Sequence, residues 1–290
     1  MKPYNLTWQN RELALGRRTC IMGILNITPD SFSDGGRFFS LDAALSRAES
    51  MIREGADIID VGGESSRPFS EPVDAEEETA RVLPVIEHLA GKISIPISID
   101  TTKAVVARRA MEAGAAIIND ISALRIDPKM GEVAAKTGAL VVLMHMLGSP
   151  KTMQVDPRYD DLIGEIYAFL ETAVTTAEAA GIPTSNIIVD PGIGFGKTVS
   201  HNLELIHNAH RFLPLGVPLM IGPSRKAFIR KLLAGENRLE NENEATHEMV
   251  ETGTQAAVSA AILAGAHIIR VHDVARTRAT ATIIDALRGL

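Results

Sequence analysis

A short apolar run that ends in an acid and a glycine-rich loop is the clearest chemical motif of this chain. In IIVDPGIGFGK (187–197) three β-branched residues precede Asp190 and Pro191, and three glycines follow. An aspartate that leaves a buried strand beside Phe195 suits a flat polar heterocycle, because its carboxylate can accept two N–H groups while the aromatic ring lines the wall. Asp, Pro and Gly also favour tight turns, so the motif alone leaves both interpretations open.

Two nucleotide-binding motifs do not fit this loop. A P-loop needs a glycine five residues before Gly196-Lys197-Thr198, and Pro191 stands there. The dinucleotide fingerprint needs G-x-G-x-x-G, whereas here the third glycine comes one residue early.

Polar residues stand at the ends of the other apolar runs, and they form two groups. Asp100, Asn119, Asp190 and Lys226 offer acceptors, donors and a cation, enough to hold the edges of a polar bicyclic base. The second group has donors and positive charge without a carboxylate, which suits phosphates, and comprises Asn26, Arg67, Arg270 and His272. In Arg270-Val271-His272 the alternation of a strand places the two polar residues on one face.

A repeated unit predicts how these side chains are positioned. Four segments are nearly alike, each a Gly-Ala helix end followed by a short apolar strand: GADIID (55–60), GAAIIND (114–120), GALVVL (138–143) and GAHIIRV (265–271). Four further strands are expected at 20–26, 95–100, 186–190 and 217–222, with amphipathic helices between them, such as 41–55, 74–90 and 160–181. Alternating strands and helices imply a parallel sheet. Eight units predict an α/β fold, a single (β/α)₈ TIM barrel whose loops after the strands build the active site.

The expected division of the chain is an N-terminal extension over 1–18 and a barrel over 19–290. We expect the extension to form a short hairpin that closes the bottom of the barrel. The Ala-rich helix near 249–264 could pack at an interface. His201, His207 and His210 are expected on the surface of a helix.

Composition excludes several classes of protein. The 290 residues are 46% apolar and carry a net charge of −7, which disfavours nucleic acid as a partner. No run is apolar enough to cross a membrane, and residues 2–18 do not have the apolar segment of a signal peptide. The single cysteine, Cys20, cannot pair within the chain and favours a cytoplasmic location. We expect it in the core.

Eight motifs together resemble dihydropteroate synthase. They are NITPDSFSDGG (26–36), GGESSRP (62–68), IDTTK (99–103), NDIS (119–122), MHM (144–146), DPGIGFGK (190–197), GPSRK (222–226) and RVHDV (270–274). The resemblance covers nearly the whole chain in order. It implies a TIM barrel that joins 6-hydroxymethyl-7,8-dihydropterin diphosphate to 4-aminobenzoate in folate synthesis. It also implies Mg²⁺ as cofactor, a homodimer and a target of sulfonamides.

The same resemblance implies roles for individual residues. Asp100, Asn119, Asp190 and Lys226 would hold the pterin, with Ile121 and Met144 packing in its slot. Asn26 would bind Mg²⁺, while the diphosphate would be held by Asn26, Arg67, Arg270 and His272. Arg270 would also lie over the pterin, and Asp100, Lys226 and Arg270 would be catalytic. The aminobenzoate site would comprise Ser66, Pro68, Phe195 and Ala227.

Three residues depart from the usual family pattern. Ser66 stands where threonine is common, Phe69 replaces a small residue, and Ala227 replaces a serine that meets the aminobenzoate carboxylate in many members. The free N–H groups of the helix that follows Lys226 can still hold that carboxylate.

Two rival functions remain open on the sequence. A pterin-binding methyltransferase domain shares the acids that hold the pterin, but it has no diphosphate to hold. The basic residues Arg67, Arg270 and His272 therefore argue against it. A pterin-binding barrel without catalytic activity is distinguished only by measuring turnover.

Overall fold

A computed structural model describes residues 2–8, 11–27, 41–65, 72–235 and 245–289 of the chain. Their strands form an eight-stranded parallel sheet in the order β8-β7-β6-β5-β4-β3-β10-β9 and a separate two-stranded hairpin. The eight strands are β3 (Cys20–Asn26), β4 (Ile58–Gly62), β5 (Ile97–Asp100), β6 (Ile117–Asp120), β7 (Leu140–Met144), β8 (Ile187–Asp190), β9 (Met220–Ile221) and β10 (Ile268–Val271). The predicted TIM barrel and its eight strand positions are confirmed.

Closure of the barrel is completed between β8 and β9. A single parallel bridge joins Val189 to Leu219, and the Val189 amide donates to the Pro218 carbonyl at 3.0 Å. Because both ends of the sheet meet there, the carboxyl ends of all eight strands face one mouth.

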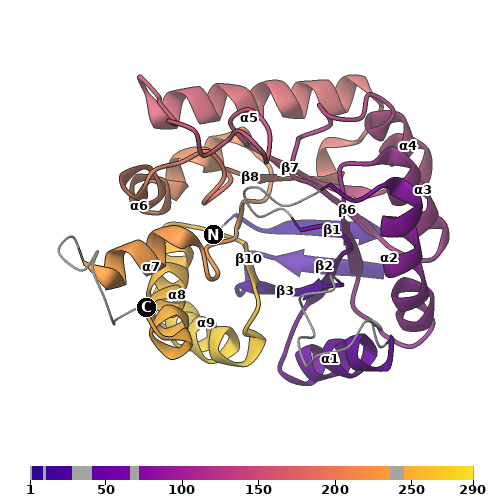
Figure 1. Ribbon diagram of the computed structural model, residues 1–290, viewed down its shortest axis with the longest axis horizontal. Helices are drawn as coiled ribbons and strands as arrows, with labels where there is room; N and C mark the ends of the chain where they lie inside the picture. The colour runs from indigo at the N-terminus through magenta and orange to yellow at the C-terminus, as the bar shows by residue number, and fades with distance from the viewer. Residues whose placement is uncertain (1, 9–10, 28–40, 66–71, 236–244, 290) are drawn as a thin grey trace.

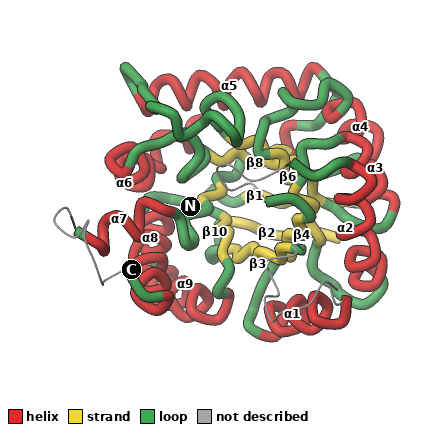
Figure 2. Tube along the Cα trace, viewed as in Figure 1, coloured by secondary structure: helices red, strands yellow, loops and turns green. Residues whose placement is uncertain are grey.

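Helices surround the strands, as Figures 1 and 2 show. They are α1 (Leu41–Arg53), α2 (Ala75–Ala90), α3 (Ala104–Glu112), α4 (Met130–Thr137), α5 (Leu162–Ala179), α6 (Val199–His207), α7 (Ala227–Ala234), α8 (His247–Leu263) and α9 (Val274–Arg288). Their apolar faces bury the outward side chains of the strands in one large core, which includes Val271, Val61 and Val141. Polar caps start several of them: the Asp74 side chain accepts from the Glu77 amide at the start of α2.

The N-terminal residues form the predicted hairpin, β1 (Tyr4–Trp8) paired antiparallel with β2 (Arg11–Leu15). Leu6, Trp8 and Leu15 are buried and cluster with inward side chains from the amino ends of the strands, among them Met22 and Ile188. The hairpin therefore covers the end of the barrel opposite the mouth. Cys20 lies in this same core, as predicted.

The three histidines expected on a helix surface do not all lie there. His207 and His210 are exposed, but His201 is half-buried: its ring packs edge-on against Tyr159, and its Nδ1 accepts from the Thr198 amide. The surface interpretation is therefore wrong for His201, because the residue belongs to the capping box of α6.

No helix among the described residues is long and apolar enough to span a membrane.

Candidate active site

The mouth of the barrel holds a small cavity at the carboxyl ends of the strands. Its lining includes seven residues that the sequence predicts, namely Asn119, Ile121, Met144, Asp190, Phe195, Lys226 and Arg270. Ile193, Met220 and Gly222 complete the lining. Six of the seven predicted pterin residues, all but Asp100, therefore line one cavity.

Strand register explains why residues so distant in the sequence meet. Asn26 pairs with Gly62, Gly62 with Asp100, and Asp100 with Asn119, so these four lie in one row across β3 to β6. Gly62 leaves room in that row. A Cβ atom at Gly62 would lie 3.5 Å from Asn26 Oδ1 and 3.5 Å from Asp100 Cβ.

Arg270 is held between two carboxylates. Its Nε donates to Asp60 Oδ2 at 2.6 Å, and its Nη2 donates to Asp100 Oδ2 at 2.6 Å. Asp60 also accepts a hydrogen bond from Asn119 Nδ2 at 3.1 Å. These contacts raise the already high pKa of Arg270 further, since the two negative charges outweigh the cost of burial. Asp100 does not line the cavity itself, but it touches the arginine that does.

Burial moves the pKa values of Asp100, Asp190 and Lys226 toward one another. Loss of water raises the pKa of Asp100 to about 7 and that of Asp190 to about 6. The pKa of Lys226 falls to about 7, because of desolvation first and the positive charge of Arg270 second. Shifts of this size cluster at functional sites.

The glycine loop 191–197 is tied down by side chains from outside it. Gln154 Nε2 donates to the Gly194 carbonyl at 2.7 Å, and Tyr159 Oη donates to the Gly196 carbonyl at 2.9 Å. The Gly194 amide donates to Asn202 Oδ1 at 2.6 Å. Lys226 Nζ lies 3.9 Å from the centre of the Phe195 ring, on the wall that this loop forms.

Lys197, the last residue of this loop, bonds back to the loop and to His145. Lys197 Nζ is 2.9 Å from the Phe195 carbonyl, to which it donates, and 3.0 Å from His145 Nδ1. The pKa of Lys197 is lowered to about 7 by burial, and that of His145 to about 2 by burial and by the neighbouring cations. Gly192 has a φ of 76°, and a Cβ there would lie 1.9 Å from the His145 carbonyl oxygen. Only glycine fits that contact.

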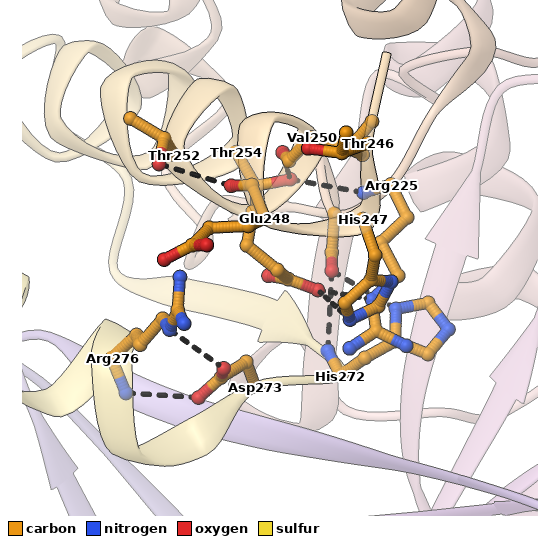
Figure 3. Close-up of polar contacts among 12 residues, drawn as sticks. Arg225, Thr246, His247, Glu248, Val250, Thr252, Thr254, His272, Asp273 and Arg276 are labelled. Carbon is orange, nitrogen blue, oxygen red and sulfur yellow. Dashed lines mark hydrogen bonds and ion pairs between the residues drawn. The ribbon is translucent and has the colours of Figure 1, made fainter. Parts of the chain in front are cut away.

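A second set of contacts fixes the segment before α7. Ser224 Oγ and His272 Nδ1 share a hydrogen bond of 2.9 Å, and Arg225 donates from Nε to the buried Glu251 of α8. Figure 3 shows Arg225 in contact with Thr254 of α8, and His272 next to Asp273, where α9 begins. Arg225 adopts a φ of 57°, and its amide donates to Thr254 Oγ1. The turn places Lys226 at the cavity and Ala227 as the first residue of α7.

The remaining predicted residues lie as follows. Arg270 and His272 are partly buried and the intervening Val271 is fully buried against the helices, which confirms the predicted alternation. Asn26 ends β3 beside Gly62. The four loop residues Ser66, Arg67, Pro68 and Phe69 lie outside the described residues.

Sequence reasoning assigned no role to Asp60, Lys197 or Asn202. Asp60 is the last residue of the segment GADIID (55–60), but only the fold shows what it touches.

Comparison with known proteins agrees with this site. The family model described as "Pterin binding enzyme" matches residues 22–272. Dihydropteroate synthase of Synechocystis sp. is 46% identical over 94% of this chain and 91% of its own, and that of Escherichia coli is 46% identical over 92% and 90%.

Solved structures give the same result. A Yersinia pestis dihydropteroate synthase in a sulfonamide drug complex superposes with a TM-score of 0.89 at 42% identity, covering 98% of this chain and 99% of that one. A Xanthomonas albilineans dihydropteroate synthase with 4-aminobenzoic acid has a TM-score of 0.89 at 40% identity and covers 100% of both chains. With its barrel, its cavity and these relatives, the chain belongs to the dihydropteroate synthase family of pterin-binding enzymes.

Proposed function

We propose that this protein condenses 6-hydroxymethyl-7,8-dihydropterin diphosphate with 4-aminobenzoate, giving 7,8-dihydropteroate and pyrophosphate in folate biosynthesis. The observation that carries this proposal is the cavity that Asn119, Asp190 and Lys226 line beside Arg270. It offers carboxylate and amide acceptors on one side and cations on the other, as a pterin with an attached diphosphate requires.

The pterin ring lies in this cavity. Asp190 accepts the Gly192 amide on Oδ1 at 2.7 Å, which fixes the carboxylate and leaves Oδ2 for ring N–H groups. Ile121 and Met144 pack against the ring in an apolar cluster. Lys226 donates to a ring acceptor, and the guanidinium plane of Arg270 lies over the ring face.

The reaction is a dissociative substitution. The bond between the exocyclic carbon and the diphosphate oxygen breaks, and pyrophosphate leaves with the electron pair. The positive charge on the carbon spreads into the dihydropterin ring, where the ionised Asp100 stabilises it. The neutral amine of 4-aminobenzoate then forms the new C–N bond and loses a proton. Arg270, His272 and Arg67 hold the diphosphate, and no side-chain nucleophile takes part.

Asn26 is the proposed protein ligand of Mg²⁺. The described residues contain no group of three His, Cys, Asp or Glu side chains that could hold a metal by themselves. One amide oxygen at the mouth fits Mg²⁺, which keeps several waters and is commonly bound through one or two protein oxygens plus substrate phosphates. When bound, Mg²⁺ neutralises charge that builds on the departing pyrophosphate.

Aminobenzoate binds on the Phe195 side of the cavity. The first turn of α7 has no side-chain cap among the described residues, so its amides can hold the carboxylate at Ala227. Ser66 and Pro68 complete this subsite. Sulfonamides are expected to compete there with aminobenzoate.

The enzyme is proposed to act as a cytoplasmic homodimer. Exposed apolar side chains on neighbouring helices support an interface: Leu232 of α7 is 48% exposed, and Met249 and Leu263 of α8 are 42% and 59% exposed. The unpaired Cys20 supports a reducing compartment. Light scattering from the protein in solution is expected to give twice the mass of the chain.

Pyrophosphate release tests the function. Protein mixed with Mg²⁺ and both substrates is expected to release one pyrophosphate for each dihydropteroate formed, and omission of 4-aminobenzoate is the control. Pterin binding without any pyrophosphate release would favour a barrel that binds pterin but has no catalytic activity. Methyl transfer to a corrinoid would favour the methyltransferase.

A further inference from the structure

Asp60 contacts two residues of the cavity without lining it. It lies on β4, its side chain has no exposed surface, and its Oδ2 accepts from both Arg270 Nε and Asn119 Nδ2. Its other oxygen, Oδ1, is buried and has no hydrogen-bond partner among the described residues. Burying a carboxylate is costly unless it is paired and hydrogen-bonded. Asp60 is therefore held in place by its contacts with Arg270 and Asn119.

The contact with Asn119 determines which way that amide faces. A carboxylate only accepts, so Asn119 must direct its NH₂ group toward Asp60. The reverse orientation would place two oxygens 3.1 Å apart without a proton between them. Asn119 Oδ1 is therefore directed away from Asp60.

The contact with Arg270 fixes a second group of donors. Asp60 takes Nε and Asp100 takes Nη2, so carboxylates hold two sides of the guanidinium and determine its plane. Among the described residues Nη1 has no partner. It is the nitrogen left for a bound anion or ring.

We propose that Asp60 is a positioning residue that sets the hydrogen-bonding polarity of the pterin cavity. Through Asn119 it presents an acceptor to the ring, and through Arg270 it presents a donor. The cavity then selects a heterocycle whose edge has N–H groups opposite Asn119 and Asp190. This inference rests on the proposed function, since it assigns the ring to that cavity.

A reciprocal exchange tests the proposal. The probe is 6-hydroxymethyl-7,8-dihydropterin, which has no diphosphate, titrated calorimetrically into wild type, Asn119→Asp, Asp60→Asn and the double variant. Asn119→Asp alone places two carboxylates together and is expected to weaken binding about 100-fold. In the double variant the new amide at position 60 donates to the new carboxylate at position 119, which still offers an oxygen to the ring. The same position accepts from Arg270 Nε in wild type, so the amide loses that contact and the recovery is partial. Binding is expected to recover at least about tenfold relative to Asn119→Asp.

Asp60→Leu provides a second comparison in case Asn119→Asp does not fold. Asparagine at position 60 keeps an acceptor for Arg270 and Asn119, whereas leucine keeps none, so Asp60→Leu is expected to bind the pterin at least about tenfold more weakly than Asp60→Asn. The control is Asp57→Asn, a carboxylate replaced at the opposite end of the barrel, which is expected to leave pterin affinity unchanged.

Two results would overturn the proposal. One is a double variant that binds no more tightly than Asn119→Asp, and the other is equal pterin affinity of the Asp60→Asn and Asp60→Leu proteins. Failure of the proposed function shows itself separately, as wild type that binds pterin but releases no pyrophosphate with Mg²⁺ and 4-aminobenzoate.

Discussion

At the scale of single residues, the cavity is organised by ionisable groups that burial brings close to neutral pH. The acids Asp100 and Asp190 have raised pKa values and the base Lys226 has a lowered one. Desolvation is the largest cause for each of the three. The pterin that we propose to bind here restores hydrogen bonds that water no longer supplies, so part of the cost of burial is recovered on binding.

Replacement of Asp190 by alanine is expected to remove detectable pterin binding while the fold survives. A buried ring edge loses a charged acceptor, which costs about 3 kcal/mol or more. Calorimetry with the pterin and thermal unfolding of the same sample measure both effects. His207→Ala is the matched control, because His207 is exposed on α6. Wild-type pterin affinity in the folded Asp190→Ala protein would contradict the assignment of Asp190 as a pterin-binding residue.

Pterin affinity is expected to fall as the pH drops through about 6. Burial raises the pKa of Asp190 to about 6, so the carboxylate that accepts ring N–H groups becomes protonated below that value. Affinity that depends on the ionised form falls about tenfold per pH unit there. Titrations between pH 5 and pH 8 measure it. Asp190→Asn is measured where its weaker binding is still detectable, and its pterin affinity is expected not to fall with pH in this range. The same dependence of affinity on pH in both proteins would mean that a group other than Asp190 titrates.

At the scale of elements, the ends of strands and the loops after them carry the site. The eight strands and seven lining residues are predictable, because short apolar runs and the residues that follow them are local signals. The supports of the glycine loop are not. Gln154, Tyr159 and Asn202 stand in ordinary polar or helical sequence, and only packing brings them to the loop. The partial burial of His201 is not predictable for the same reason, since it depends on the cap of α6 and on Tyr159.

The start of α7 gives a prediction about the second substrate. Ala227→Ser is expected to tighten aminobenzoate binding by about 0.5–1.5 kcal/mol, the usual net value of one hydrogen bond. The hydroxyl joins amides at a helix start that no described side chain caps. The Michaelis constant for 4-aminobenzoate at saturating pterin diphosphate measures the change, and Ala234→Ser at the other end of α7 is the control. A higher constant in Ala227→Ser would place the carboxylate elsewhere.

At the scale of the whole molecule, the mouth depends on a barrel that must close from chain segments far apart in sequence. Asp57, just before β4, joins three of them. It accepts from Arg18 beyond the hairpin, from the Ile21 amide of β3 and from Arg278 of α9. The C-terminal helix is fixed nearby, since Asp285 accepts from the amide and hydroxyl of Thr19. The first and last parts of the chain are thus tied at the closed end.

Asp57→Asn is therefore expected to lower the free energy of unfolding by about 1.5–3 kcal/mol, the range for hydrogen bonds to charged groups. Chemical denaturation of the variant and of wild type at pH 7 measures the difference in their free energies of unfolding. Asp156→Asn is a matched control, because Asp156 forms an ion pair with the exposed Arg158. An equal loss in both variants would mean that Asp57 does not tie the segments together.

The pH dependence of the Asp57 contribution follows from the sign of its pKa shift. Burial alone would raise the pKa of this carboxyl, but the hydrogen bonds from Arg18 and Ile21, together with the charges of Arg18 and Arg278, lower it below 3.8. A group whose pKa is lower in the folded state stabilises the fold above its unfolded pKa and loses that contribution as the pH falls through the folded value. The difference in unfolding free energy between wild type and Asp57→Asn is therefore expected to stay level from pH 7 to about pH 5. It shrinks only at more acidic pH. A difference that already declines between pH 7 and pH 5 would mean that burial, not the arginines, controls this carboxylate.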